Sequence, residues 1–137
     1  MFAASGFLKR MRLWVPLALV FAISCAVYAG EPDRIAVAAD GRAESSEVSR
    51  AAARSPHFLI FDEDGRLLEA VDNPYRDAAR RAGPSVARFL ADKGVEIVAA
   101  GEFGGRMSQA LKGEGIEFLE FRGSAAEAVE KIIGAGK

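Results

Sequence analysis

The sequence predicts an α/β fold in which a mixed five-stranded sheet is covered by helices and is preceded by an N-terminal signal segment. Three observations lead to this prediction. In the second half of the chain, short apolar runs alternate with helical patterns, which is typical of parallel strands joined by crossover helices. In the first half, two apolar runs flank a tight turn and predict an antiparallel hairpin. The first 29 residues differ from the rest, because a positive start is followed by a long apolar run.

Residues 1–29 have the layout of a secretory signal peptide. Lys9, Arg10 and Arg12 precede an apolar run over residues 13–29, which ends in Val27-Tyr28-Ala29 with small residues where a signal peptidase cuts. Cleavage after Ala29 would leave an exported, periplasmic domain. This pattern makes export the expected localisation.

Two alternatives remain for the same segment. Residues 21–25 are similar to a lipoprotein box, in which Cys25 would be lipidated. The apolar run could also stay as an anchor, although it is short for a span of about 20 residues. In either case the membrane would be a partner only through this N-terminal segment.

Cysteine content and charge exclude several kinds of site. Cys25 is the one cysteine of the chain, so a domain that begins after it has no disulfide and no thiolate ligand for a metal. The segment before Gly30 carries three of the 18 Lys and Arg and none of the 19 Asp and Glu, which leaves the domain with a net charge of −4. This balance argues against a partner made of nucleic acid, which requires a basic face.

The first half of the domain is predicted to supply three strands. Residues 34–39 are an apolar run that stops at the turn pair Asp40-Gly41. Residues 57–62 and 66–71 are the two strands of the hairpin, and Gly65 in the turn between them tolerates positive φ. Residues 42–56 are the connecting loop.

The second half is predicted to alternate helices and strands. A helix over residues 82–93 has Pro84 in its first turn, where proline is tolerated. Strands follow at residues 95–100 and 116–121, with a helix between them. The last helix opens at Ser124 with Glu127 three residues later, which is a capping box.

Two loops follow the carboxyl ends of strands, where ligands bind in open α/β sheets. The first, residues 40–56, contains four candidate ligand-binding residues. They are Asp40, Ser49, Arg50 and Arg54. Guanidinium and hydroxyl donors suit an anionic ligand.

The second loop, residues 101–105, has the sequence GEFGG and leads into a helix. Gly101, Gly104 and Gly105 are candidates to present backbone N–H groups to an anion at the start of that helix. A plain strand-to-helix turn would use the same glycines. The spacing matches no nucleotide-binding motif.

Two further chemistries are weaker alternatives. His57, the one histidine, is the candidate metal ligand, but it has no second histidine to join it. Asp40 and Glu102 each follow a strand and could hold a divalent cation for hydrolysis. No catalytic residue or motif is assigned, and we expect a protein that is not an enzyme.

Several stretches resemble the dinitrogenase iron–molybdenum cofactor biosynthesis family. They are residues 35–41, 46–49 and 54–62, with shorter matches through Gly115-Ile116, and the resembling domain spans residues 34–134. The resemblance implies a ribonuclease-H-like three-layer α/β/α fold. It also implies a role as a non-catalytic carrier of an iron–sulfur or iron–molybdenum cluster. Ser49 and Arg54 match the family loop, whereas Ala51 stands where the family has a histidine.

The expected function is therefore an exported, non-catalytic binding domain that holds an anionic or metal-cluster ligand in a cleft between loops 40–56 and 101–105. Redox or metal-handling proteins are the expected partners. A first alternative is an adaptor that binds a protein partner on the same scaffold and has lost its cofactor. A second alternative is a metal-dependent hydrolase that uses Asp40 and Glu102.

Overall fold

The computed structural model describes residues 34–135. The predicted signal segment at residues 1–29, with both of its alternatives, lies outside this range and stays a prediction. Within the range, no helix combines the length and apolar character needed to cross a membrane.

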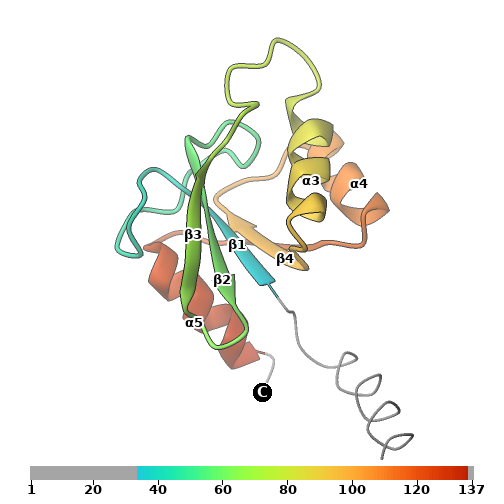
Figure 1. Cartoon of the computed structure of the whole chain (residues 1–137). Helices are drawn as coiled ribbons and strands as arrows, with labels where there is room; N and C mark the ends of the chain where they lie inside the picture. Colours follow the sequence, from blue (N-terminus) through green and yellow to red (C-terminus); the bar gives the residue numbers. More distant parts are fainter. Residues whose placement is uncertain (1–33, 136–137) are drawn as a thin grey trace, which may run out of the picture. The chain divides into compact units, whose positions relative to one another are not determined.

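Residues 34–135 form five strands and three helices, in the order that the sequence predicts (Figure 1). They are β1 (Arg34–Ala39), β2 (His57–Asp62), β3 (Leu67–Asp72), α3 (Ala82–Asp92), β4 (Ile97–Ala100), α4 (Gly105–Gly113), β5 (Glu117–Glu120) and α5 (Ala125–Ala135). The largest differences from prediction are that β4 starts two residues later and that β5 is shorter at both ends.

The strands form one mixed sheet in the order β3-β2-β1-β4-β5. β1 is parallel to β4, and β4 is parallel to β5. β2 is antiparallel to both of its neighbours, β1 and β3. The prediction of a mixed five-stranded sheet is confirmed, whereas the ribonuclease-H-like likeness stays a prediction.

Two apolar cores lie on opposite faces of the sheet, because successive side chains of a strand point to opposite faces. Ala36 and Ala38 of β1 contribute to the core under α3 and α4. Ile35 and Val37 contribute to the core under α5. Figure 1 shows the corresponding layers, with α3 and α4 on one side of the sheet and α5 on the other.

The start of α5 is closed by its own capping residues and by the loop after β1. The Ser124 N–H donates to Glu127 Oε1 at 2.9 Å, and the Glu127 N–H donates to Ser124 Oγ at 3.2 Å. The N–H groups of Ala125 and Ala126 donate to carbonyls of Ser46 and Glu44. The predicted capping box is confirmed, and it satisfies donors that a helix start otherwise leaves unpaired.

This cap predicts a pH dependence of stability. Two hydrogen bonds with Ser124 hold the pKa of Glu127 below its ordinary value of 4.5. The bond with the Ser124 backbone has the larger effect, and the bond with the Ser124 side chain has the smaller one. A carboxyl whose pKa is lowered on folding stabilises the protein above its unfolded pKa, and this stability is lost as the pH falls through the folded pKa. Urea unfolding between pH 7 and pH 3 should show this loss. In Glu127→Gln the uncharged amide keeps a cap, so that part of the pH dependence should disappear, and an unchanged profile would contradict the assignment.

Candidate anion-binding site

The two loops that the sequence predicted as walls of a cleft are bonded to each other along part of their length. The Gly101 N–H donates to the Ser49 carbonyl at 2.8 Å, and the Ala52 N–H donates to the Glu102 carbonyl at 3.1 Å. A Cβ built on Gly101 would lie 2.9 Å from the Cα atom of Arg50. No cleft exists between residues 49–52 and 101–102. The prediction of a cleft between the two loops is therefore wrong for this part of their length.

We call the bonded contact between residues 49–52 and 101–102 the seam. A pocket of about 740 Å³ opens beyond it. One wall consists of Ala53 and Arg54, which continue the first loop, and a second wall consists of residues 104–107. A third wall, residues 79–84, joins β3 to α3 and was not predicted as part of any site. The pocket therefore retains both predicted loops but requires a third segment.

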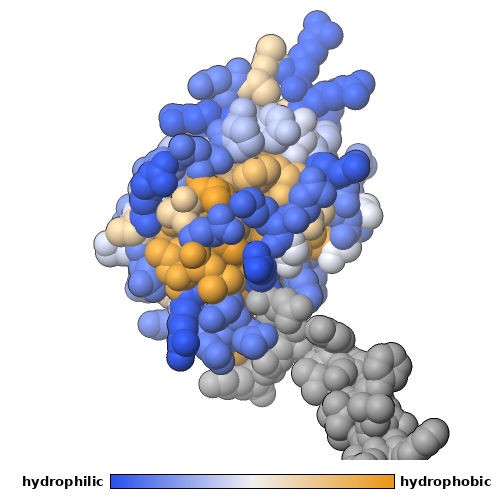
Figure 2. Space-filling model, viewed as in Figure 1, coloured by the Kyte–Doolittle hydropathy of each residue, from blue (hydrophilic) through white to orange (hydrophobic). Residues whose placement is uncertain are grey.

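Four arginine side chains line this pocket. Arg54 comes from the first loop, Arg80 and Arg81 precede α3, and Arg106 lies in the first turn of α4. The other residues along these walls are alanine, glycine, proline and methionine, so the described lining has no acidic side chain. Four guanidinium groups in one concave surface create a positive potential that concentrates anions. Figure 2 shows hydrophilic side chains projecting from this end of the molecule.

Two helices begin at the pocket, and neither start is capped by a side chain. α3 begins at Ala82 and α4 at Gly105, and neither has an acidic residue in its first turn. The starts lie close together, because a Cβ on Gly83 would be 3.1 Å from the Met107 backbone nitrogen. Unpaired N–H groups and the positive ends of helix dipoles attract anions. The start of α5 contrasts with these two, because it is filled by protein groups.

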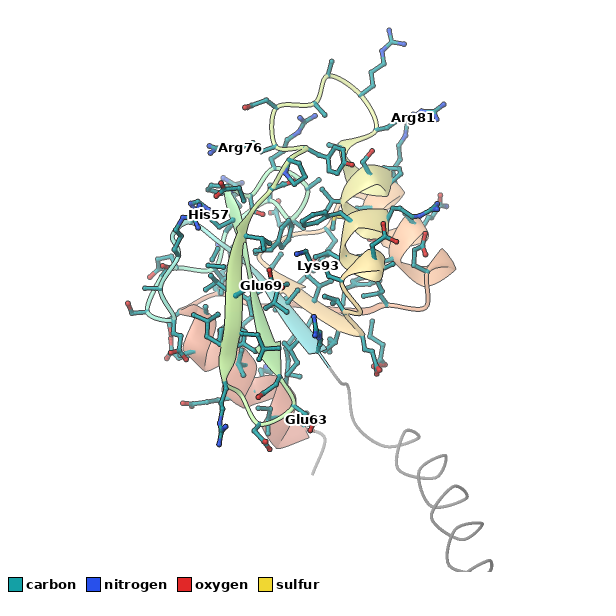
Figure 3. The ribbon with its side chains drawn as sticks, viewed as in Figure 1. His57, Glu63, Glu69, Arg76, Arg81 and Lys93 are labelled. Atoms are coloured by element: carbon teal, nitrogen blue, oxygen red, sulfur yellow. The ribbon has the colours of Figure 1, made fainter. Side chains whose placement is uncertain are left out.

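Arg81 has an unusual backbone conformation beside the pocket. Its φ is 58° and its ψ is 28°, which is the left-handed region, and among the described residues it is the one non-glycine with positive φ. Such conformations cost free energy and occur mostly where the surrounding structure imposes them, often at binding sites. Figure 3 shows Arg81 at the end of the segment that leads into α3.

Three of the predicted ligand-binding residues line the pocket and four do not. Arg54, Gly104 and Gly105 are part of its walls. Ser49 is buried, and its backbone joins β1 to loop 101–105. Arg50 is exposed, and its Nε lies 4.0 Å from Glu102 Oε2. Gly101 serves the seam described above, and Asp40 is exposed at the end of β1.

Sequence reasoning missed Arg80, Arg81 and Arg106. The adjacent pair at 80 and 81 lies directly before a helix start, and Arg106 directly follows the two glycines. Basic residues at a helix start are unfavourable with the helix dipole. That departure from the usual acidic first turn is the signal that could have identified them.

His57, the predicted metal ligand, lies in an ion-pair cluster. His57 Nδ1 lies 3.0 Å from Asp72 Oδ1, and Arg42 donates to the same carboxylate oxygen. Within residues 34–135, no group of three His, Cys, Asp or Glu is arranged to hold a metal ion. His57 as a metal ligand and the Asp40–Glu102 hydrolase therefore gain no third ligand from the structure.

The pocket does not fit direct ligation of a metal cluster. Iron and molybdenum clusters are bound in proteins chiefly through cysteine thiolates and histidine nitrogens. The pocket lining has neither, and Ala51 is exposed outside it. Guanidinium groups and backbone amides are hydrogen-bond donors. They therefore suit the negatively charged exterior of a ligand.

The fold and the site together define the class of this protein. It is an α/β domain with an arginine-lined pocket at the carboxyl ends of its strands. The chain belongs to the dinitrogenase iron-molybdenum cofactor family, whose sequence profile matches residues 33–135.

Solved structures agree with this assignment. The apo form of the orange protein from Desulfovibrio gigas is 27% identical, with 79% of this chain and 92% of that protein covered and a TM-score of 0.72. A candidate NifB protein from Thermotoga is 36% identical, with 72% and 84% covered and a TM-score of 0.62. A candidate dinitrogenase from Methanocaldococcus jannaschii is 13% identical over 75% and 89%, with a TM-score of 0.54, and shows the shared fold alone. No curated protein matches the chain.

Proposed function

We propose that this protein is a non-catalytic, carrier-like domain that binds an anion in the pocket lined by Arg54, Arg80, Arg81 and Arg106. The observation that carries the proposal is that four arginine residues line one pocket, at which two helices begin without a side-chain cap. Family membership supports a role with a cofactor or its precursors as cargo.

The binding would depend on charge and hydrogen bonds to the outside of the cargo. A hydrogen bond to a charged group contributes about 1.5–3 kcal/mol, so a few such contacts are enough for micromolar affinity. An anionic iron–sulfur or iron–molybdenum cluster would enter with its own ligands complete. An oxyanion would use the same donors.

We also propose that the domain acts after export, in the periplasm or at its membrane, beside redox or metal-handling proteins. The sequence of residues 1–29 supports this part of the proposal. The mass of the mature chain tests it, because cleavage after Ala29 leaves Gly30 at the N-terminus, whereas lipidation at Cys25 leaves a heavier product.

Binding to two matched dianions tests the proposed function. Molybdate and tetrathiomolybdate have the same charge and tetrahedral shape but differ in their outer atoms. Calorimetric titration of the full domain should show saturable binding of at least one of them, weakened by added salt because exposed charges are screened. Absence of binding for both would overturn the anion proposal and favour the protein-partner adaptor.

A further inference from the structure

The segment between β3 and α3, which contributes to the third wall of the pocket, carries three arginines. We call residues 74–81 the arginine strap, and it contains Arg76, Arg80 and Arg81. Figure 3 shows two of them, Arg76 and Arg81. Its first end is fixed by Asn73, which is 3% exposed and whose Nδ2 donates to the carbonyls of Ala53 and Ser55, both at 3.0 Å. Its other end is fixed by the start of α3. The strap is therefore a short bridge between two anchored points.

Arg54 holds the middle of this bridge. Its Nη1 donates to the carbonyl of Arg76 at 3.1 Å and to the carbonyl of Ala78. These contacts cross 22 and 24 residues of sequence, so they join the first loop to the strap. The same side chain lines the pocket.

A guanidinium group can serve both tasks at once. It presents five N–H donors in a rigid planar fork, of which Nη1 supplies two. The donors on Nη2 and Nε point in other directions of that plane and suit the paired acceptors of an anion. One residue thus touches both the part of the chain that carries Arg80 and Arg81 and the space where an anion would bind.

We propose that Arg54 is a positioning residue that couples anion binding to the order of the arginine strap. An anion on its Nη2 and Nε side fixes the rotamer of Arg54, so that the bonds of Nη1 to the strap form with less further loss of side-chain entropy. The strap then holds Arg80 and Arg81 at the pocket. The inference rests on the proposed function, because it needs an anion in this pocket.

Lysine at position 54 separates charge from geometry. Arg54→Lys keeps the positive charge but has a single nitrogen, which cannot hold two carbonyls and an anion in one plane. Arg54→Gln removes both. Because Arg54 is exposed, neither variant leaves a buried cavity. Arg106→Gln is the matched comparison, since it removes a pocket charge that lies on α4 and not on the strap or its anchor.

Cleavage by trypsin reports the order of the strap directly, because trypsin cleaves after Arg76, Arg80 and Arg81. Cleavage rates at these three bonds should be followed by mass spectrometry in the full chain, with saturating molybdate or tetrathiomolybdate and without either. In the wild type, the bound anion should slow cleavage by about fivefold or more, the lower range of typical coupling between two sites. Arg106→Gln should need more anion but reach the same protection. Arg54→Lys and Arg54→Gln should bind anion with little protection.

The result that would overturn the inference is equal protection in the wild type and both Arg54 variants at saturation. Faster cleavage of the variants without anion, but with the wild-type protection factor, would also overturn it, because Arg54 would then be only a structural anchor. If titration shows that the wild type binds neither anion, the proposed function fails first and the coupling fails with it. Binding without protection in the wild type removes the coupling alone.

Discussion

Replacing Arg80 and Arg81 together with glutamine is expected to lower anion affinity by at least about 100-fold, because two charge-assisted hydrogen bonds contribute about 3 kcal/mol or more. The fold should keep its stability. Both side chains are exposed, and removing positive charge beside the start of α3 relieves an unfavourable interaction with the helix dipole of about 0.3–1 kcal/mol. Calorimetric titration with molybdate and tetrathiomolybdate measures the first effect, and thermal unfolding without anion measures the second.

The matched control is the double variant Arg66→Gln with Arg88→Gln. It removes the same charge from two exposed positions outside the pocket, one in the β2–β3 turn and one in α3, where Arg88 Nε lies 4.0 Å from Asp92. Its affinity should stay close to that of the wild type. Equal weakening in the two double variants would show that net charge, and not the pocket, attracts the anion.

Replacing Gly101 with alanine is expected to destabilise the protein by about 1–3 kcal/mol, the usual range for overpacking a well-packed site. The new Cβ would lie 2.9 Å from both the Cα and the carbonyl oxygen of Arg50. Backbone atoms cannot rotate away, so the bonded seam between the two loops must widen. Urea unfolding measures the loss of stability. Anion titration should show weaker binding, because residues 104–107, which form a wall of the pocket, come shortly after Gly101 in the chain and would shift with it.

Gly104→Ala is the comparison for this prediction. No heavy atom lies within 4 Å of a Cβ built on Gly104, and its φ of −69° suits any residue. Alanine there should leave stability unchanged or raise it by about 0.4–1 kcal/mol through the unfolded chain. If Gly101→Ala were as stable as Gly104→Ala, the close packing of the two loops would be wrong.

The order of the elements was predictable because local patterns determine it. The apolar run at residues 34–39 becomes β1, and Gly65 in the turn at 63–65 has a φ of 88°. The capping box at Ser124 forms as expected. Each of these signals operates over a few residues, where periodicity and turn chemistry are decisive.

The third wall of the pocket was not predictable in the same way. Residues 75–81 have no helical or strand period, so the sequence indicates only a polar connection. In the structure Arg54 contacts the carbonyls of Arg76 and Ala78, which are far from it in the chain. Likewise, nothing local shows that Ser49 bonds to Gly101 and closes the expected cleft.

The sequence by itself determined the α/β class, the family and a domain without thiols, since these depend on composition, period and motif. Only the tertiary structure decided which arginines share a pocket. Arg54, Arg81 and Arg106 are separated by about 25 residues each along the chain. They meet because the parallel pairing of β1 with β4 brings the carboxyl ends of these two strands to one edge of the mixed sheet, while α3 and α4 pack through Gly83.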